Sequence, residues 1–196
     1  MNTDIEFMIT AEQIDKELII TILSTSFDDN KSVNYIIKQD GKRESRLRKL
    51  MAYSFDVCKL FGDVLFSDDK KACALIVYPY KKKTSFKSIW LDAKLAFSCI
   101  GISHIRKAMK REAIIKMQHP QQPLAYLWFI GVKPTEQNKG AGSRLLQDIL
   151  VKSRNDGLIV CLETSTERNL PWYEKHGFKI YKELDFGYKL YCMKSP

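Results

Sequence analysis

The last third of the chain alternates between short apolar runs and amphipathic segments, and this alternation limits the possible folds more than any other feature. Residues 124–132 and 158–164 are apolar runs typical of buried strands, while residues 140–154 have the period of a helix. Two strands joined in this way are expected to be parallel neighbours with a right-handed crossover. A short helix at 170–176 and strands from Phe178 onward complete a β-α-β-α-β-β order. We therefore predict an α/β (α+β) fold with a central mixed sheet and flanking helices.

The first 120 residues are expected to supply helices and one β-hairpin. Periodicity predicts a first helix over residues 11–26, with Thr10 as its cap. Its apolar face would carry Ile14, Leu18 and Ile22. The other expected elements, in chain order, are helical stretches at 34–38 and 43–60, hairpin strands at 64–66 and 72–80, and helices at 86–99 and 103–118.

A chain of 196 residues is long enough to bury a core without disulfides or a structural metal. No repeat or linker divides it, so we expect one domain over residues 1–196, in which 1–120 shape one side and 124–180 form the core of the site. The five cysteines are scattered and fit no zinc or disulfide pattern. No apolar run has the length of a membrane span, and no signal peptide is evident. We expect a cytoplasmic protein without a metal, either a monomer or a homodimer.

The net charge of +9 comes from one segment of the chain. Residues 81–116 hold ten bases against two acids, whereas residues 1–30 hold one base against seven acids. Residues 120–196 carry eleven bases and eight acids, so this part of the chain is not suited to binding a bulk polyanion.

Two glycines mark the start of the helix at 140–154. The sequence Lys139-Gly140-Ala141-Gly142-Ser143 follows a strand and a proline turn. Backbone N–H groups at a helix N-terminus, uncovered by glycine, form a pocket for a pyrophosphate, and the helix dipole favours the anion. Neither the Walker pattern nor the Rossmann fingerprint fits, because the required later glycine or Gly-Lys pair is missing.

The residues around these glycines resemble the GNAT acetyltransferase superfamily. The run Gln137–Gly142 is similar to the family's Gln/Arg-x-x-Gly-x-Gly/Ala loop, with Val132-x-Pro134 upstream. A second motif, Asn169-Leu-Pro-Trp-Tyr-Glu-Lys-His-Gly-Phe178, resembles the family's Asn…Tyr-Glu-Lys-x-Gly-Phe ending. Together with Leu162-Glu-Thr-Ser165 it is similar to the puromycin acetyltransferase-like branch. The resemblance covers about residues 124–180.

The resemblance implies acetyl-CoA as the cofactor. The loop amides would hold its pyrophosphate, the strand ending at Val132 would pair with the pantetheine arm, and the N–H of Ile130 or a neighbour would polarise the thioester carbonyl. Gly131 is expected to mark a bulge that splays this strand from its neighbour. Asn169 would either contact the cofactor or cap its helix. The expected cofactor-binding residues are Ile130, Val132, Gln137, Asn138, Lys139, Gly140, Ala141, Gly142, Ser143 and Asn169.

Two residues are candidates for the chemistry. By the resemblance, Tyr173 would protonate the leaving thiolate; alternatively it is a packed aromatic beside Trp172 and Phe178. Glu163, at the end of its strand, would take the proton of the amine directly or through water, or would only close a surface ion pair. His176 is expected to cap a helix C-terminus rather than to act in catalysis.

The expected reaction is direct transfer of acetyl to a primary amine of a small molecule. Aromatic residues that would line the acceptor side are Phe27, Tyr78, Tyr80 and Trp128, with Tyr53 and Trp90 as further candidates. Two alternatives remain: an enzyme acting on a protein or peptide amine, and a noncatalytic CoA-binding module whose segment 81–116 binds nucleic acid or a membrane surface. Nucleic acid is not the expected partner, because apolar residues interrupt these bases.

Overall fold

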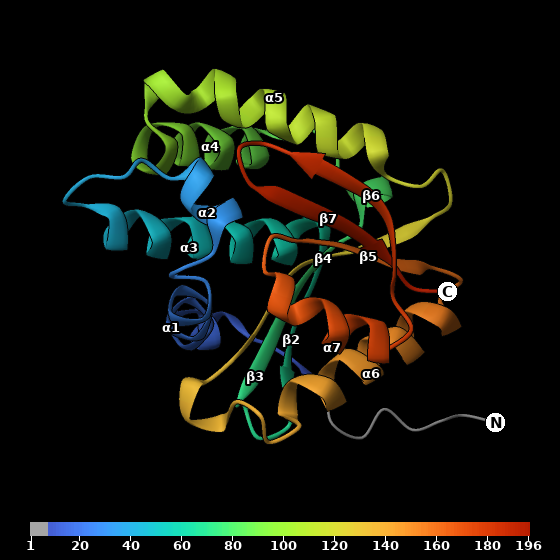
Figure 1. The fold of residues 1–196 in the computed structure, drawn as a ribbon. Helices are drawn as coiled ribbons and strands as arrows, with labels where there is room; N and C mark the ends of the chain where they lie inside the picture. Colours follow the sequence, from blue (N-terminus) through green and yellow to red (C-terminus); the bar gives the residue numbers. More distant parts are fainter. Residues whose placement is uncertain (1–7) are drawn as a thin grey trace.

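The computed structural model describes residues 8–196 and is built around one seven-stranded sheet with the order β1-β2-β3-β4-β5-β7-β6 (Figure 1). All neighbouring strands are antiparallel except β4 and β5, which are parallel as the sequence predicts. The strands are β1 Met8–Thr10, β2 Gly62–Ser67, β3 Ala72–Val77, β4 Leu124–Val132, β5 Ile159–Thr164, β6 Lys179–Asp185 and β7 Lys189–Lys194.

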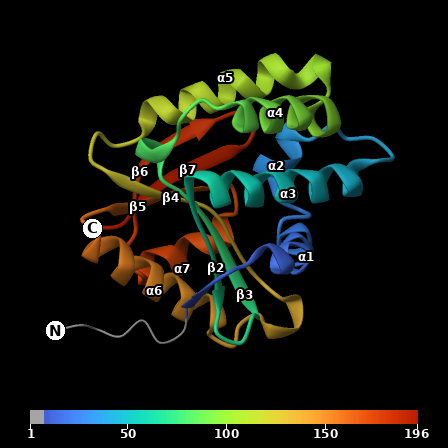
Figure 2. The ribbon, with the colours of Figure 1, turned by 180° about the vertical axis from the view of Figure 1, so that it is seen from behind.

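Helices cover both faces of this mixed sheet, which confirms the predicted fold class. The helices are α1 Lys16–Ser26, α2 Lys31–Ile36, α3 Arg43–Phe61, α4 Phe86–Leu95, α5 Ile102–Gln118, α6 Ala141–Asn155 and α7 Leu170–Lys175. In Figures 1 and 2, α6 and α7 lie near the β2–β5 part of the sheet, and α4 and α5 run along the opposite edge of the molecule.

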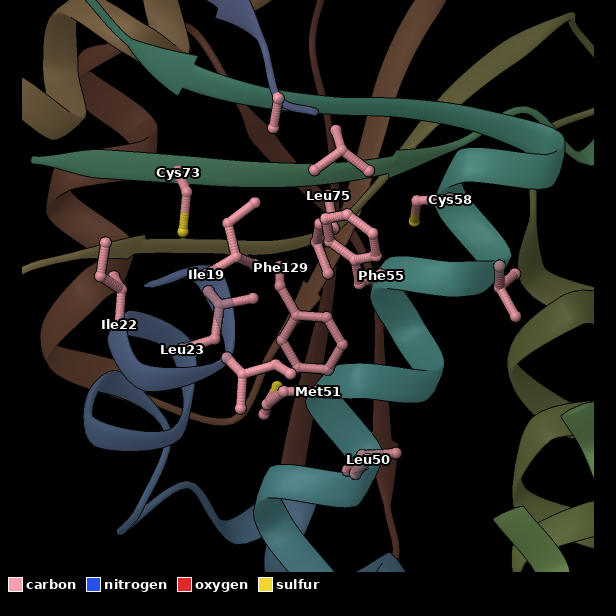
Figure 3. Packing of buried hydrophobic residues seen from close by; sticks show 14 of the residues in the cluster. Ile19, Ile22, Leu23, Leu50, Met51, Phe55, Cys58, Cys73, Leu75 and Phe129 are labelled. Atoms are coloured by element: carbon pink, nitrogen blue, oxygen red, sulfur yellow. The ribbon is translucent and has the colours of Figure 1, made fainter. Parts of the chain in front are cut away.

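Two apolar clusters lie on the two faces of the sheet. The first is built from α1, α3 and one face of β2–β4, with Ile19, Leu23, Phe55 and Leu75 fully buried (Figure 3). The second joins α6 and α7 to the other face, around Leu145, Leu146 and Phe178. We call the first the α1/α3 face and the second the α6/α7 face.

The first predicted helix forms, but its start and its buried side differ from the expectation. Thr10 lies in β1, where it pairs with Leu65 of β2. The helical segment starts instead with a 3₁₀ turn at Gln13–Asp15. Ile14 lies in this turn and is 90% exposed, because the turn shifts the helical phase. Reciprocal hydrogen bonds between Glu12 and Asp15 form the cap.

The second helix begins three residues earlier than predicted. Its N-cap is Asn30, whose side-chain oxygen accepts a hydrogen bond from the Val33 N–H at 3.0 Å. The predicted break near Gly101 is present: a π-helical turn at Ala96–Ile100 extends α4, and Gly101, with φ +78°, separates it from α5.

The bulge in β4 lies at Trp128, so the prediction that Gly131 marks it is wrong. The pairing with β3 changes register between Leu75↔Phe129 and Ile76↔Leu127, which leaves Trp128 as the extra residue, while Gly131 pairs in register with Cys73. Gly131 has a different role, because a Cβ there would lie 2.9 Å from Leu23 Cδ2. The glycine lets α1 approach the strand.

No helix within residues 8–196 is long and apolar enough to cross a membrane.

Candidate functional site

The parallel strands β4 and β5 separate part of the way along their length. They pair only over Leu124–Tyr126 and Ile159–Cys161, although β4 continues to Val132 and β5 to Thr164. Beyond that point β5 pairs with β7, and β4 pairs with β3. The edge of β4 that faces β5 therefore carries backbone groups that can pair with an extended ligand.

The predicted anion-binding loop joins the end of β4 to α6. Asn138 and Gly140 adopt positive φ angles of 62° and 88°. The first hydrogen bond of the helix runs from the Arg144 N–H to the Gly140 carbonyl, at 3.0 Å. The N–H groups of Ala141, Gly142 and Ser143 precede that bond and have no acceptor within the helix. They form the positive end of a 15-residue helix.

The glycine loop leaves little room for a side chain at Gly142. A Cβ on Gly142 would lie 3.0 Å from Val132 Cγ2 and 3.9 Å from the Trp172 ring. The positive φ of Gly140 is likewise costly for other residues. A backbone kept free of side chains, with helical N–H groups exposed, is the arrangement that binds pyrophosphate.

Helix α7 is tied to this loop and carries Tyr173. The Trp172 indole N–H donates to Ser143 Oγ at 2.9 Å, and the rings of Trp172 and Tyr173 are 4.8 Å apart between centroids. Tyr173 is buried and also packs on Phe178. Burial raises the pKa of Tyr173 well above its usual value, so its hydroxyl stays protonated at neutral pH.

Asn169 occupies the N-cap position of α7, but its side chain makes no capping hydrogen bond. His176 stands at the C-cap, with Nδ1 2.7 Å from the Trp172 carbonyl oxygen, as expected for a capping imidazole.

Glu163 lies on the α1/α3 side of the sheet, just beyond the point where β4 and β5 separate. Its side chain is only 4% exposed, which excludes the surface ion pair considered from sequence. The Tyr126 hydroxyl donates to its Oε2 at 2.5 Å, and His119 Nε2 lies 3.4 Å from its Oε1. His119 Nε2 and Glu163 Oε1 are both buried, and neither makes a hydrogen bond to any described residue. One carboxylate oxygen of Glu163 can therefore accept a hydrogen bond or a proton beside the His119 imidazole.

The tyrosines and cysteines around Glu163 are held in their protonated forms. Burial, with the Glu163 charge, raises the pKa of Tyr126 well above its usual range. Burial also raises the pKa of the Cys161 and Cys192 thiols to about 12, and the buried Tyr181 hydroxyl has a pKa raised chiefly by burial. At neutral pH these four neighbours are uncharged, whereas Arg111 places a positive charge near Tyr126 and Cys192.

Two of the four predicted acceptor-side aromatics come together. Phe27 packs on Phe129 at 4.9 Å between centroids, and Trp128 lies 5.6 Å from the same ring. Tyr53 joins them, 6.0 Å from Trp128.

Tyr78 and Tyr80 are placed elsewhere. The Tyr78 hydroxyl donates to Asp63 at 2.6 Å and accepts from Lys152 of α6, which puts this ring on the α6/α7 face. Tyr80 packs on Tyr78 and is 58% exposed. Trp90 is 61% exposed on α4.

Tyr126 and His119 are residues that the sequence did not single out as part of the site. They lie 37 and 44 positions before Glu163, and the register of the parallel strands brings the first of them beside it. In the sequence, Tyr126 is a tyrosine on the same predicted strand as Trp128, and His119 is a histidine at the end of a predicted helix. Neither position indicates that the side chain contacts Glu163.

Residues 98–180 match the family model described as acetyltransferase (GNAT) domain. Among solved structures, one described as histone acetyltransferase HPA2 and related acetyltransferase from Corynebacterium glutamicum is similar, with a TM-score of 0.70 and 18% identity over 96% of this chain and 94% of that chain. The C-terminal condensation domain of Ebony in complex with beta-alanyl-dopamine has a TM-score of 0.70 and 9% identity over 96% and 97% of the two chains. Arabidopsis thaliana Naa50, in complex with a bisubstrate analogue of CoA and a peptide, has a TM-score of 0.51 and 10% identity over 96% and 97%.

The match covers the separated strands, the glycine loop and α7, and the structural similarities extend over the whole described sheet. The described chain therefore has the fold of GNAT acetyltransferase structures, and residues 98–180 carry the sequence match to the GNAT acetyltransferase domain.

Proposed function

We propose that the protein transfers an acetyl group from acetyl-CoA to a primary amine of a small molecule, without a covalent enzyme intermediate. The observation that carries this proposal is the buried Glu163 carboxylate, with one unpartnered oxygen, at the point where β4 and β5 separate. A base in that position can receive the proton of an amine as it attacks. The similarity of Leu162–Ser165 and Asn169–Tyr173 to the puromycin acetyltransferase-like branch supports a small acceptor.

Acetyl-CoA, when bound, supplies an activated acetyl thioester. The N–H groups of the 137–143 loop would hold its pyrophosphate, with Lys139 adding a positive charge nearby. The backbone of Ile130 and Val132 lies on the part of β4 that β5 leaves unpaired, and it would pair with the pantetheine arm. Asn169 has an uncommitted side chain beside α7 that would contact the same arm.

Glu163 serves as the base, held by Tyr126 and connected to solvent by His119. The short hydrogen bond from Tyr126 fixes one oxygen and leaves the other toward His119. The His119 side chain is 16% exposed, against 4% for Glu163, so the imidazole lies between the carboxylate and water. A proton taken by Glu163 would leave through His119.

Tyr173 holds the proton that the leaving thiolate needs. Its raised pKa keeps it protonated, and none of the described side chains forms a hydrogen bond with its hydroxyl that would compete for that proton. Because α7 is tied to the cofactor loop through Trp172, the position of this hydroxyl depends on the same loop that would hold the cofactor.

The acceptor is expected to be small because the base is covered. The end of α5 brings His119 over Glu163, and Phe27 and Trp128 supply apolar surface on the same face. The placement of Tyr78 and Tyr80 gives no support for an acceptor role.

The apolar clusters on the two faces of one sheet support a single domain, and the five buried, unbridged cysteines fit a reducing, cytoplasmic location.

A panel of amines with thiol release as the readout tests this function. We expect turnover with small primary amines that carry an apolar or flat body, and a kcat at least about a hundredfold lower for Glu163→Gln, while CoA still binds. Efficient acetylation of peptides or proteins, with no turnover of small amines, would contradict the proposed acceptor. Binding of CoA without turnover of any amine would contradict the proposed reaction.

A further inference from the structure

Helix α4 exposes an apolar face that points away from the rest of the protein. Its buried side consists of Ser88 and Leu91, which face the α1/α3 cluster. On the opposite side, three large apolar side chains of α4, at positions i, i+3 and i+4, stand in solvent together with a fourth from the π-helical turn that extends the helix. They are Phe86 (95% exposed), Ile89 (54%), Trp90 (61%) and Phe97 (69%), which together we call the α4 stripe.

This arrangement is unusual because the exposed side of a surface helix is normally polar. Single exposed apolar residues need no explanation, whereas a contiguous row marks a surface that meets another apolar phase. The row is also not part of the proposed acceptor site, since Glu163 and His119 lie under the far end of α5. Figures 1 and 2 show α4 beside α5, on the side of the molecule away from α6 and α7.

Two lysines of the helix accompany the α4 stripe. Lys87 and Lys94 lie along one flank of the row, whereas Lys81, before the helix, is turned to Tyr78, with its ammonium 4.4 Å from the centroid of that ring. The Lys94 ammonium lies 5.0 Å from the centroid of the Trp90 ring. The one acid on the helix, Asp92, accepts a hydrogen bond from the Tyr53 hydroxyl at 2.6 Å on the side toward α3. The charge presented beside the stripe is therefore positive.

The charge decides between possible occupants of the stripe. A second copy packed on the same face would place two segments of net charge +8 together, at an electrostatic cost. Duplex nucleic acid would satisfy the lysines but offers no apolar phase to Phe86 and Ile89. An anionic bilayer satisfies both, because aromatic rings lie at the boundary between headgroups and acyl chains while lysines reach the phosphates.

We propose that the α4 stripe and its flanking lysines dock this enzyme on the surface of anionic lipid membranes. The helix would lie in the plane of the interface, with Trp90 and Phe97 inserted and Lys87 and Lys94 at the headgroups. This proposal does not depend on the identity of the acceptor amine or on the role of Glu163.

Co-sedimentation with vesicles tests it. The full chain is mixed with vesicles of phosphatidylcholine alone and with vesicles that contain phosphatidylserine. We expect binding to the second kind, with an affinity that falls as salt is raised, and little binding to the first. Binding at equal strength to both kinds, or to neither, would overturn the proposal.

Variants separate the two contributions. Trp90→Ser/Phe97→Ser removes two exposed rings and is expected to lower vesicle affinity at least about tenfold. Lys87→Gln/Lys94→Gln is expected to lower it about 25-fold at low salt, at about fivefold for each lysine. Ile14→Ser, which removes a still more exposed apolar side chain from another surface, and Lys175→Gln/Lys179→Gln are matched controls that should bind like wild type.

Two measurements keep the result unambiguous. CoA binding and the melting temperature should be unchanged in the stripe variant, because all of the substituted side chains are exposed. Sedimentation velocity without lipid shows whether the α4 stripe forms a dimer instead. A dimer that the stripe variant converts to monomer, or salt-sensitive binding of DNA or RNA stronger than that to vesicles, would overturn the membrane proposal.

Discussion

The two faces of the sheet carry different kinds of chemistry. The α6/α7 face holds the glycine loop, Trp172 and Tyr173, all within one stretch of the chain. The α1/α3 face holds Glu163 with partners from β4 and from the end of α5, far apart in sequence. In the proposed function, the α6/α7 face serves the acyl donor and the α1/α3 face serves the acceptor. The point where β4 and β5 separate lies between the two faces.

The strongest test of the donor side is Gly142→Glu. The new side chain would collide with Val132 and place a negative charge among amides that should hold a phosphate. Losing two hydrogen bonds to a charged group costs about 3–6 kcal/mol, so CoA affinity measured by calorimetry should fall more than about a hundredfold. Gly41→Glu, at a position where a Cβ meets nothing within 4 Å, is the matched control. If Gly142→Glu bound CoA as tightly as wild type, the glycine loop would not be the phosphate site.

The acceptor side is tested by Glu163→Gln, which keeps the shape of the side chain and removes the base. We expect kcat to fall by about 10²- to 10⁴-fold, with CoA affinity unchanged. In wild type the rate should rise with pH as the bound amine loses its proton, because only the neutral amine can attack the thioester. Tyr126→Phe keeps the carboxylate and should have a smaller effect. A variant as active as wild type would show that this face supplies no base.

The sequence predicts the glycine loop and the start of α6 well and the surroundings of Glu163 poorly, for a physical reason. A helix N-terminus is local, so Gly140 and Gly142 mark it within a few residues of sequence. The partners of Glu163 depend on the register of two parallel strands and on where a long helix ends. Neither can be read from periodicity. The exposure of Ile14 has a similar origin, since one 3₁₀ turn changed the phase of an otherwise correct helix.

Tyr173→Phe tests whether the donor face also takes part in the chemistry. Loss of the hydroxyl should lower kcat by about 10²-fold or more, while KM for acetyl-CoA stays nearly constant. Since burial raises the pKa of Tyr173 above its usual value of 10.0, the high-pH limb due to its ionisation should lie above pH 10 and be absent from the variant. An unchanged kcat with an unchanged melting temperature would reduce Tyr173 to a packing residue, and a lowered melting temperature alone would do the same.

The smallest effect on turnover is expected for Cys→Ser at each of the five cysteines. All are buried, and burial raises the pKa of the thiols, including Cys161 and Cys192 near Glu163. A protonated thiol is a poor nucleophile, so direct transfer predicts kcat within a few-fold of wild type, with some loss of thermal stability. A burst of thiol release would indicate an acyl-enzyme. If one of these substitutions abolished that burst, transfer would proceed through a covalent intermediate in two steps and not directly.

The extra residue at Trp128 has a consequence for how this strand can change during evolution. Before the bulge, Tyr126 faces the α1/α3 side; after it, Phe129 faces that same side, and Ile130 and Val132 face α6 and α7. Two successive residues, Trp128 and Phe129, therefore lie on the same side, which a strand of strict alternation does not allow. Deletion of Trp128 should restore that alternation and leave Phe129, Ile130 and Val132 on their present faces. The bulge thus adds a second aromatic ring to the α1/α3 side at no cost to the orientation of the residues that follow.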